Sequence, residues 1–148
     1  MTLDFSVNLP TLSCDVMTRE DIPQTLGPGK KVMVVDDDED FRMLLCARLE
    51  RKGMDCFEAE NGEVAKWQLS THHVDLVVTD NHMPKMDGLT LINWLQEHQK
   101  YIPIIFVSGD LSAGIIEQIE QARVYYIFEK PCSLAKLSQK VEEALTIC

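Results

Sequence analysis

The sequence predicts a single α/β domain in which one parallel five-stranded sheet is covered by helices on both faces. From Lys30 onward, short runs rich in Val, Ile and Phe alternate five times with segments whose apolar residues recur at helical spacing. The short runs are apolar at their centres, as parallel strands buried on both faces are. Parallel strands also need crossover helices between them, and the chain supplies one after each run.

The first two strand–helix units form the N-terminal half of the domain. The run KVMVV at 31–35 is a β-branched strand, and a helix follows from about 39 to 52, where Gly53 is suited to end it. MDCFEA at 54–59 is the second strand, and Asn61 can cap the helix after it. The expected inward faces of the two helices are Phe41, Leu44, Leu45 and Leu49, then Val64, Ala65, Trp67 and Leu69.

The other three units follow the same pattern. The expected strands are VDLVVT at 74–79, IPIIFVS at 102–108 and VYYIFE at 124–129. The turn HMPKMDG precedes the third helix, and Ser133 can cap the last one. The apolar faces of these three helices are Leu91, Ile92 and Leu95; Ile115, Ile116 and Ile119; and Leu134, Leu137, Val141, Ala144 and Leu145.

Residues 1–29 differ from the rest of the chain. Proline and glycine punctuate them, and no period of 2 or 3.6 persists. We predict an N-terminal extension over 1–29, disordered or loosely docked, and a folded domain over 30–148.

The composition excludes several classes of function. A net charge of −10 argues against direct binding of nucleic acid or of anionic membranes, and it suits a divalent cation or a basic partner surface. No apolar run approaches the roughly 20 residues that span a bilayer, and no basic secretory leader is visible, so we expect a cytoplasmic location. The five cysteines are odd in number and lack CxxC spacing, which predicts buried free thiols at Cys46, Cys56 and Cys132.

Polar residues follow the ends of four expected strands. Asp36 and Asp37 follow the first, Asp80 the third, Ser108 ends the fourth, and Lys130 follows the fifth. Ligands of such sheets bind beyond the carboxyl ends of the strands, where the strand order reverses. We therefore expect these side chains to meet at one edge of the sheet.

This residue set suits magnesium and phosphate chemistry. Mg²⁺ prefers hard oxygen ligands and needs only one or two carboxylates beside phosphate oxygens. A carboxylate that the metal does not fully use can attack phosphorus, while a lysine neutralises charge on the transferred oxygens. The run from Asp36 to Asp40 is then two features end to end, because Asp38, Glu39 and Asp40 fall at a helix N-terminus, where negative charge is favourable.

Four motifs in this order resemble the CheY-like receiver domains of two-component response regulators. They are VVDDDED, DLVVTDNHMPKMDG, PIIFVSGD and FEKP, and the resemblance covers about residues 30–146. It implies a flavodoxin-like (βα)5 domain with strand order 2-1-3-4-5. No GxGxxG or GxxxxGK[ST] motif indicates a dinucleotide-binding or P-loop version of the sheet.

The resemblance implies a role for each matching residue. Asp80 is similar to the phosphoacceptor of the family, and Asp36, Asp37 and Asp80 with the backbone carbonyl of His82 are similar to its Mg²⁺ ligands. Ser108 corresponds to the hydroxyl that moves to hydrogen-bond the phosphoryl group.

The remaining motif residues also have counterparts. Lys130 corresponds to the family's lysine, and the bond to Pro131 after it is often cis. Gly88 fits the tight turn after MPKMD, and Gly109 is the small residue that lets the phosphoryl group enter. His82 and Asp110 occupy positions that flank the route of attacking water, so we expect them to tune the lifetime of the phosphoryl group.

One position departs from the family pattern. Receivers usually carry Tyr or Phe three residues before the lysine as a rotamer switch, and here that residue is Ile127, with Tyr126 one place away. A shift of one residue in a strand points a side chain to the opposite face. We therefore hypothesise that movement of Ser108 is transmitted by rearrangement of residues 109–122.

The resemblance implies a phosphorylation-dependent signalling switch and not an enzyme with an external substrate. The phosphodonor would be a histidine kinase or a histidine phosphotransfer protein, and output would pass through protein contacts of the face within 112–146. No effector domain follows the last helix, so we expect a stand-alone receiver, without direct nucleic-acid or membrane binding.

Three alternatives compete with this interpretation. The chain could be a receiver module or fragment of a larger regulator or hybrid histidine kinase. It could be an aspartate-nucleophile phosphatase, although DDDED lacks the DxDx[TV]-type motif and the length leaves little room for a cap domain. It could also bind partners regardless of phosphorylation, or drain phosphoryl groups from a kinase.

Overall fold

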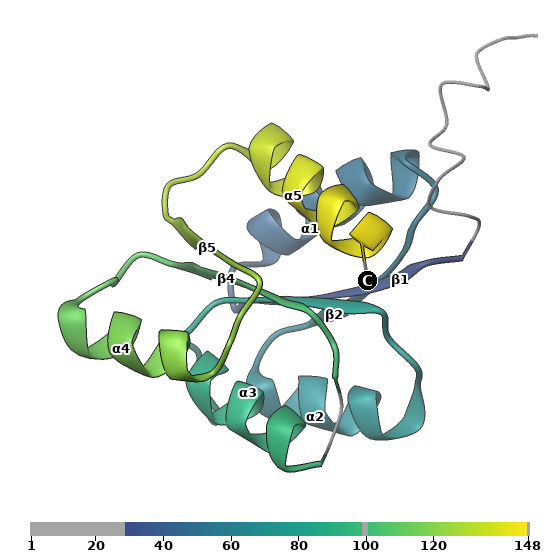
Figure 1. Cartoon of the computed structure of the whole chain (residues 1–148). Coiled ribbons are helices and arrows are strands. Elements are labelled where there is room, and N and C mark those ends of the chain that lie inside the picture. The colour runs from purple at the N-terminus through teal and green to yellow at the C-terminus, as the bar shows by residue number, and fades with distance from the viewer. Residues whose placement is uncertain (1–28, 99–100, 148) are drawn as a thin grey trace, which may run out of the picture.

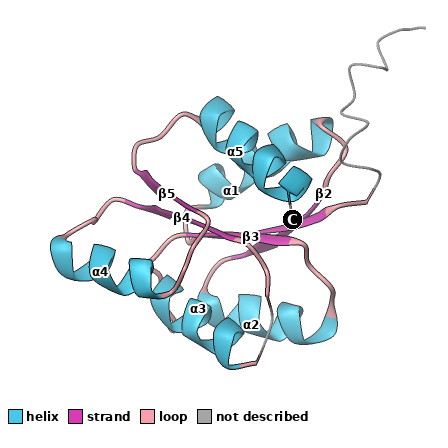
Figure 2. Ribbon diagram, in the orientation of Figure 1, coloured by secondary structure: helices cyan, strands magenta, loops and turns pink. Residues whose placement is uncertain are grey.

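The computed structural model describes residues 29–98 and 101–147. There a parallel sheet with strand order β2-β1-β3-β4-β5 alternates with helices, which confirms the predicted fold class and strand order (Figures 1 and 2). The predicted extension over 1–29 lies outside the described residues apart from Gly29. The elements are β1 (Lys31–Val35), α1 (Glu39–Arg51), β2 (Asp55–Ala59), α2 (Gly62–Thr71), β3 (Leu76–Thr79), α3 (Gly88–Glu97), β4 (Ile104–Ser108), α4 (Ala113–Gln121), β5 (Tyr126–Glu129) and α5 (Leu134–Ile147).

The strand register brings the carboxyl ends of the strands level with one another. The last residue of β1, Val35, pairs with Ala59 of β2 and with Thr79 of β3. Ser108 at the end of β4 pairs with Glu129 at the end of β5. The strand order reverses beside β1, so the residues that directly follow β1 and β3 are neighbours at the expected position for a site.

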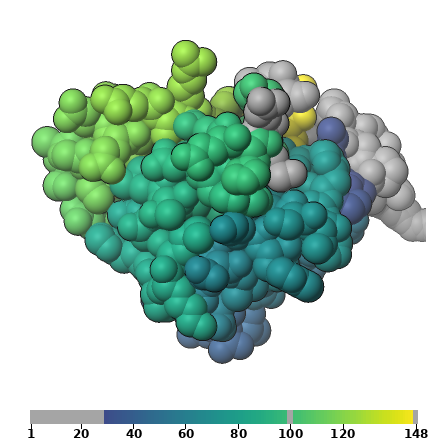
Figure 3. All heavy atoms as spheres, turned by 90° about the horizontal axis from the view of Figure 1, so that it is seen from below, coloured from purple at the N-terminus to yellow at the C-terminus, as the bar shows by residue number. Residues whose placement is uncertain are grey.

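Two helical layers cover the sheet and create two cores. Helices α1 and α5 lie on one face, and α2, α3 and α4 lie on the other, as Figure 1 shows and Figure 3 views from the side of the second layer. Successive residues of β1 alternate between the cores because side chains of a strand point to opposite faces. Val32 and Val34 pack with the first layer, while Met33 and Val35 pack with the second.

The predicted helix ends are confirmed at three positions. Asn61 caps α2 by accepting the Val64 N–H through Oδ1 at 2.9 Å, and the Ser133 hydroxyl accepts the Lys136 N–H in the first turn of α5. Gly53 follows α1 with a φ of 94°, a conformation that favours glycine. None of the described helices is long and apolar enough to cross a membrane.

Four strands begin later than predicted. The predicted starts at 54, 74, 102 and 124 correspond to observed starts at 55, 76, 104 and 126. The reason is that apolar character reports burial and not strand pairing. Met54 and Val74 are 2% and 1% exposed, yet they precede the paired residues.

Two predicted inward residues instead face solvent. The side chains of Leu44 and Trp67 are 60% and 66% exposed, so placing them on the apolar faces of their helices was wrong. In α2 the buried residues include Ala65 and Leu69, and Trp67 lies two residues from each, about 200° around the helix. In α1 the buried stripe is Leu45, Cys46 and Leu49, and it extends away from Leu44.

The three cysteines within the described residues are free thiols, as predicted. Cys46 is buried, whereas Cys56 and Cys132 are only partly buried. Their surroundings are apolar, since Cys46 belongs to the core under α1 and α5 and the other two pack against it.

Candidate functional site

Three carboxylates meet at the carboxyl ends of β1 and β3. One oxygen each from Asp36, Asp37 and Asp80 lie within 4.8 Å of one another. Asp36 is 1% and Asp80 7% exposed, and Asp37 is exposed. Three hard oxygen donors at this spacing, open to solvent through Asp37, fit Mg²⁺, which binds through few carboxylates and keeps several waters.

Lys130 joins two of the three acids. Its Nζ lies 2.7 Å from Asp36 Oδ2 and 3.5 Å from Asp80 Oδ2. The Lys130 N–H donates to the Ser108 carbonyl at 2.9 Å, so β4 fixes the start of the β5–α5 loop. The bond between Lys130 and Pro131 is cis, as predicted. The predicted meeting of an early acid, a central acid and a late lysine is therefore observed.

Burial and neighbouring charges shift the pKa values of Asp36 and Lys130. Burial of Asp36 and the nearby Asp80 charge raise the pKa of its carboxyl above the ordinary value, although Lys130 and the Asp38 N–H pull in the other direction. Burial lowers the pKa of Lys130, but the hydrogen bond and the charges of Asp36 and Asp80 outweigh it and leave this pKa raised. Lys130 is thus held as a cation facing the acids.

The backbone around Asp80 is closely packed and hydrogen-bonded. Its N–H donates to Val35 O at 3.0 Å, and its Oδ1 accepts the Asn81 N–H at 2.7 Å. A Cβ at Gly88 would collide with the Asp80 carbonyl oxygen, so the predicted close turn after MPKMD needs glycine there. Oδ2 is left facing Lys130.

Ser108 lies at the end of β4 with 0% exposure, and its hydroxyl contacts the following loop. Its Oγ accepts the Asp110 N–H at 3.1 Å and lies 3.4 Å from the Asp110 carbonyl. A Cβ at Gly109 would meet open space, which is consistent with the predicted entry route. The roles of Ser108, Gly109 and the His82 carbonyl remain predictions.

His82 and Asp110 meet across the two loops that border the site. His82 Nε2 lies 3.3 Å from Asp110 Oδ2, and their side chains are 63% and 48% exposed. Both residues were expected near the site, but their contact was not predicted, because they come from different loops 28 positions apart.

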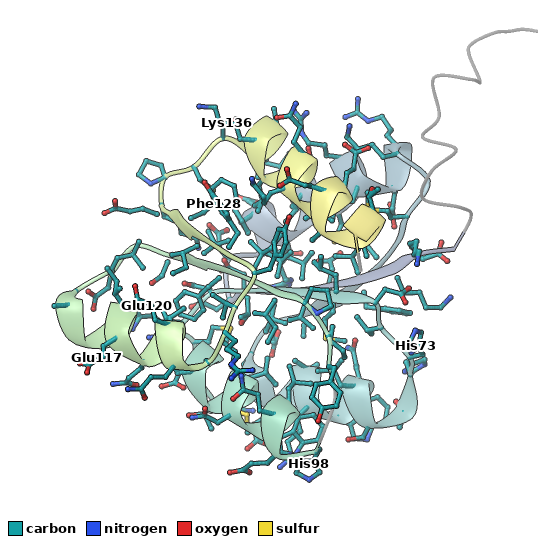
Figure 4. The ribbon with its side chains drawn as sticks, in the orientation of Figure 1. His73, His98, Glu117, Glu120, Phe128 and Lys136 are labelled. Atoms are coloured by element: carbon teal, nitrogen blue, oxygen red, sulfur yellow. The ribbon has the colours of Figure 1, made fainter. Side chains whose placement is uncertain are left out.

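The two residues near the usual aromatic switch position point to opposite faces of β5. Ile127 packs with the core under α2–α4, whereas Tyr126 is 42% exposed. The Tyr126 ring lies 4.9 Å from that of Phe128, whose side chain packs on the α5 side of the strand (Figure 4). The predicted displacement of the aromatic residue to the other face is therefore confirmed.

Two residues that hold the site, Asn81 and Arg42, could not be recognised as such from the motifs. Asn81 is 4% exposed, and its Oδ1 accepts the Leu89 N–H at 3.2 Å, which ties the β3–α3 loop to α3. Arg42 donates through Nη1 to the Asp36 carbonyl at 2.6 Å. A signal for Arg42 was available, because a basic residue in the first turn of a helix opposes the helix dipole.

The fold and the site together define a class: a parallel α/β domain with a lysine-bridged acidic pocket at the carboxyl ends of its strands. Residues 32–142 match the response regulator receiver domain family, and the chain belongs to that family. Receiver domains are regulatory phosphoacceptors, so this chain is a regulatory domain and not a turnover enzyme.

Individual relatives agree with this assignment. The chain is 38% identical over 81 residues to the alkaline phosphatase synthesis transcriptional regulatory protein PhoP of Bacillus subtilis (strain 168), covering 55% of this chain and 34% of PhoP. It is 28% identical over 116 residues to the response regulator receiver protein CpdR of Brucella abortus (strain 2308), covering 78% of this chain and 97% of CpdR. The chain thus spans about a third of one relative and nearly all of the other.

A solved structure resembles the domain over most of its length. The response regulator protein TrrA from Thermotoga maritima, solved in complex with Mg²⁺-BeF, aligns with a TM-score of 0.69 at 29% identity. The alignment covers 78% of this chain and 98% of the TrrA chain.

Proposed function

We propose that the chain is a phosphorylation-dependent signalling switch in which Asp80 accepts a phosphoryl group from a phosphohistidine on a partner protein. The observation that carries this proposal is the position of Lys130, whose Nζ faces both Asp36 and Asp80 inside the acidic pocket. An ordinary surface ion pair would not bring one cation to two carboxylates that are 1% and 7% exposed.

Asp36, Asp37 and Asp80, with the backbone carbonyl of His82, hold Mg²⁺ in this proposal. Bound there, the metal would neutralise charge on the acids and on the incoming phosphoryl oxygens. The grouping of three carboxylate oxygens within 4.8 Å supports this assignment, as does the Mg²⁺-BeF complex of TrrA.

The transfer step uses groups that the chain itself supplies. A carboxylate oxygen of Asp80 forms a bond to phosphorus while the bond from phosphorus to the donor imidazole nitrogen breaks, and the electron pair returns to that nitrogen. Lys130 pairs with the transferred oxygens and offsets their charge. Asn81 keeps Asp80 in place because its N–H binds Oδ1.

The phosphoryl group then biases the β4–α4 region toward a second arrangement. Ser108 exchanges its contacts with the Asp110 backbone for a hydrogen bond to the phosphoryl group, which frees the loop that leads into α4. Because Ile127 replaces the usual aromatic switch, the change passes mainly through residues 109–122. Amide exchange with and without beryllofluoride tests this route, and unchanged exchange over 109–122 would rule it out.

The partners follow from the same chemistry. The donor is a histidine kinase or a histidine phosphotransfer protein, and output passes to a target protein through the face within 112–146. The match to nearly all of CpdR supports a stand-alone receiver. If partner affinity is the same with and without beryllofluoride, the domain binds partners independently of phosphorylation.

A second candidate is a receiver module of a larger regulator, favoured by the relation to PhoP, of which the matched region is 34%. The size of the native protein in its source cells distinguishes the two candidates. An antibody against the receiver domain would detect a band of 16.8 kDa for the stand-alone protein and a larger band for the module.

Incubation with acetyl phosphate and Mg²⁺, followed by intact-mass measurement, tests the proposed function. Wild type is expected to gain the mass of one phosphoryl group, and Asp80→Asn to gain none. Equal labelling of the two proteins contradicts the assignment of Asp80. Turnover of p-nitrophenyl phosphate would instead favour the phosphatase alternative.

A further inference from the structure

Arg42 is an unusual residue for its position in α1. It is the fourth residue of the helix, one turn from the N-cap Asp38, where the helix dipole disfavours a cation. Its side chain is also only 12% exposed, which adds a cost of desolvation. A largely desolvated cation at the wrong end of a helix needs specific partners, and Arg42 has two.

The guanidinium of Arg42 connects two strands of the sheet. Its Nη1 donates to the backbone carbonyl of Asp36, directly after β1, at 2.6 Å. Its Nε donates to Glu58 Oε1 in β2 at 3.1 Å. Both partners accept from one rigid, planar group. The position of the Asp36 carbonyl is therefore fixed relative to the neighbouring strand β2.

Asp36 is thereby held on every polar atom. Its N–H donates to Ala59 O at 3.0 Å, Oδ1 accepts the Asp38 N–H at 2.9 Å, and Oδ2 accepts from Lys130. The carbonyl is the fourth point, and among the residues that the structure describes only Arg42 donates to it. That carbonyl belongs to the peptide that links Asp36 to Asp37.

The orientation of this peptide determines the position of the Asp37 backbone, and so the direction in which its side chain leaves it. Asp37 is exposed, and among the described residues no hydrogen bond or ion pair involves its carboxylate. Its Oδ nevertheless lies within 4.8 Å of oxygens of Asp36 and Asp80. With no contact of its own, its place in the pocket depends on the backbone before it.

We propose that Arg42, oriented by Glu58, is a positioning residue that fixes the Asp36–Asp37 peptide so that both carboxylates face the Mg²⁺ position. This inference rests on the metal site of the proposed function. The hydrogen bonds of Arg42 go to the Asp36 carbonyl and to Glu58, and not to the carboxylates that would hold the metal. Groups that orient metal ligands typically change metal affinity by ten- to a hundredfold when they are lost.

A purely electrostatic role gives a different expectation. A cation close to the acids repels Mg²⁺, so removing its charge would tighten metal binding. Positioning predicts the reverse, because a loosened peptide no longer directs Asp37. Arg42→Lys keeps the charge but lacks the planar fork, and Arg42→Gln removes the charge as well.

The experiment measures Mg²⁺ affinity of the full chain by isothermal titration calorimetry. Arg42→Lys and Arg42→Gln should each weaken binding by about tenfold. Arg42→Lys combined with Glu58→Gln should weaken it by less than the product of the single effects, because both act on one linkage. Unchanged affinity in Arg42→Lys, or tighter binding in Arg42→Gln, overturns the proposal.

A matched control separates positioning from general stability. Lys52→Met removes the ion pair between Lys52 at the end of α1 and Glu142 of α5, at 3.2 Å, far along the helix from the pocket. It should leave Mg²⁺ affinity unchanged. If Lys52→Met weakens binding as much as Arg42→Lys, the effect of Arg42 is structural and the proposal is wrong.

Amide exchange in EDTA gives a readout that needs neither metal nor phosphorylation. Arg42→Lys should speed exchange of the Asp38 N–H, which bonds to Asp36 Oδ1, while exchange within β3 stays as in wild type. Equal protection in both proteins overturns the proposal. If wild type binds no Mg²⁺, the metal part of the proposed function fails, and this measurement still decides whether Arg42 holds the loop.

Discussion

Asp36 and Asp75 lie at opposite ends of β1 and make similar contacts with opposite consequences. Asp36 follows the carboxyl end of the strand, accepts the Asp38 N–H and pairs with Lys130. Asp75 accepts the Lys31 N–H at the amino end at 2.8 Å and pairs with His73, also at 2.8 Å. Figure 4 labels His73, which belongs to the loop between α2 and β3.

The pKa values of the two carboxyls shift in opposite directions. Burial raises the pKa of Asp36, and its partners do not compensate. Burial also acts to raise the pKa of Asp75, but the Lys31 N–H and His73 outweigh it and lower the value. The difference follows exposure, since the side chain of Asp36 is 1% exposed and that of Asp75 is 23% exposed.

The two carboxylates contribute to the stability of the fold with opposite signs. Ionised Asp75 stabilises the fold, and this contribution is present above the ordinary pKa of 3.8 and is lost as the pH falls through the lowered value. For Asp36 the contribution of the ionised form to stability has the opposite sign, because its raised pKa favours the protonated form in the folded state. Ionised Asp36 therefore opposes folding, whereas ionised Asp75 supports it.

Lys130→Met should have the largest effect on stability. It leaves Asp36 and Asp80 buried without their cation, and breaking a buried pair from one side costs about 3 kcal/mol in free energy of unfolding. Urea denaturation in EDTA measures it. Lys140→Met, which breaks the ion pair with Glu143 at 2.8 Å, is the control and should change little because the Glu143 side chain is 53% exposed. Equal losses in the two variants would show that Lys130 is not buried among charges.

Asp75→Asn should reduce the free energy of unfolding by about 1 kcal/mol at pH 7, because a charge-assisted hydrogen bond to the Lys31 N–H becomes a neutral one. The difference from wild type should shrink as the pH falls below 3.8. Denaturation at a series of pH values tests both points. Asp55→Asn is the matched control, since Asp55 only approaches Lys31 Nζ at 3.9 Å.

Asp36→Asn should give the opposite pH trend in EDTA. Asparagine resembles the protonated carboxyl at all pH values, so the variant should gain stability relative to wild type as the pH rises through the raised pKa of Asp36. The same denaturation series measures this slope. A slope of the same sign as for Asp75→Asn contradicts the contrast between the two ends of β1.

His82→Ala and Asp110→Ala should have the smallest effects, confined to phosphoryl lifetime. Their contact at 3.3 Å is exposed and contributes less than about 1 kcal/mol. Loss of this contact at the border of the site should therefore shorten the lifetime of the phosphoryl group by at most about fivefold. Release of inorganic phosphate from the phosphorylated chain measures it. His73→Ala, which breaks the corresponding pair at the other end of the sheet, should leave the lifetime unchanged.

The sequence predicted the fold and the acidic pocket because both follow from local patterns. Alternating strands and helices, together with polar residues at strand ends, are enough to bring Asp36, Asp80 and Lys130 together. The strand starts at Met54 and Val74 were misplaced because burial extends beyond strand pairing. Trp67 was misplaced because an apolar residue in a helix need not lie on its buried stripe.

The supporting contacts could not be predicted in the same way. The bond from Arg42 to the Asp36 carbonyl depends on a side chain that folds back over the first turn of α1. The contact between His82 and Asp110 depends on how two loops approach each other. Side-chain direction in such places follows tertiary packing, which residue spacing does not encode.

The most direct test of the central claim is to locate the acyl phosphate. After phosphorylation with acetyl phosphate and Mg²⁺, borohydride converts an aspartyl phosphate into homoserine, and tandem mass spectrometry of peptides identifies its position. Homoserine is expected at position 80 alone. Homoserine at Asp36 or Asp37, or none at position 80 in a chain that has gained phosphate, would contradict it.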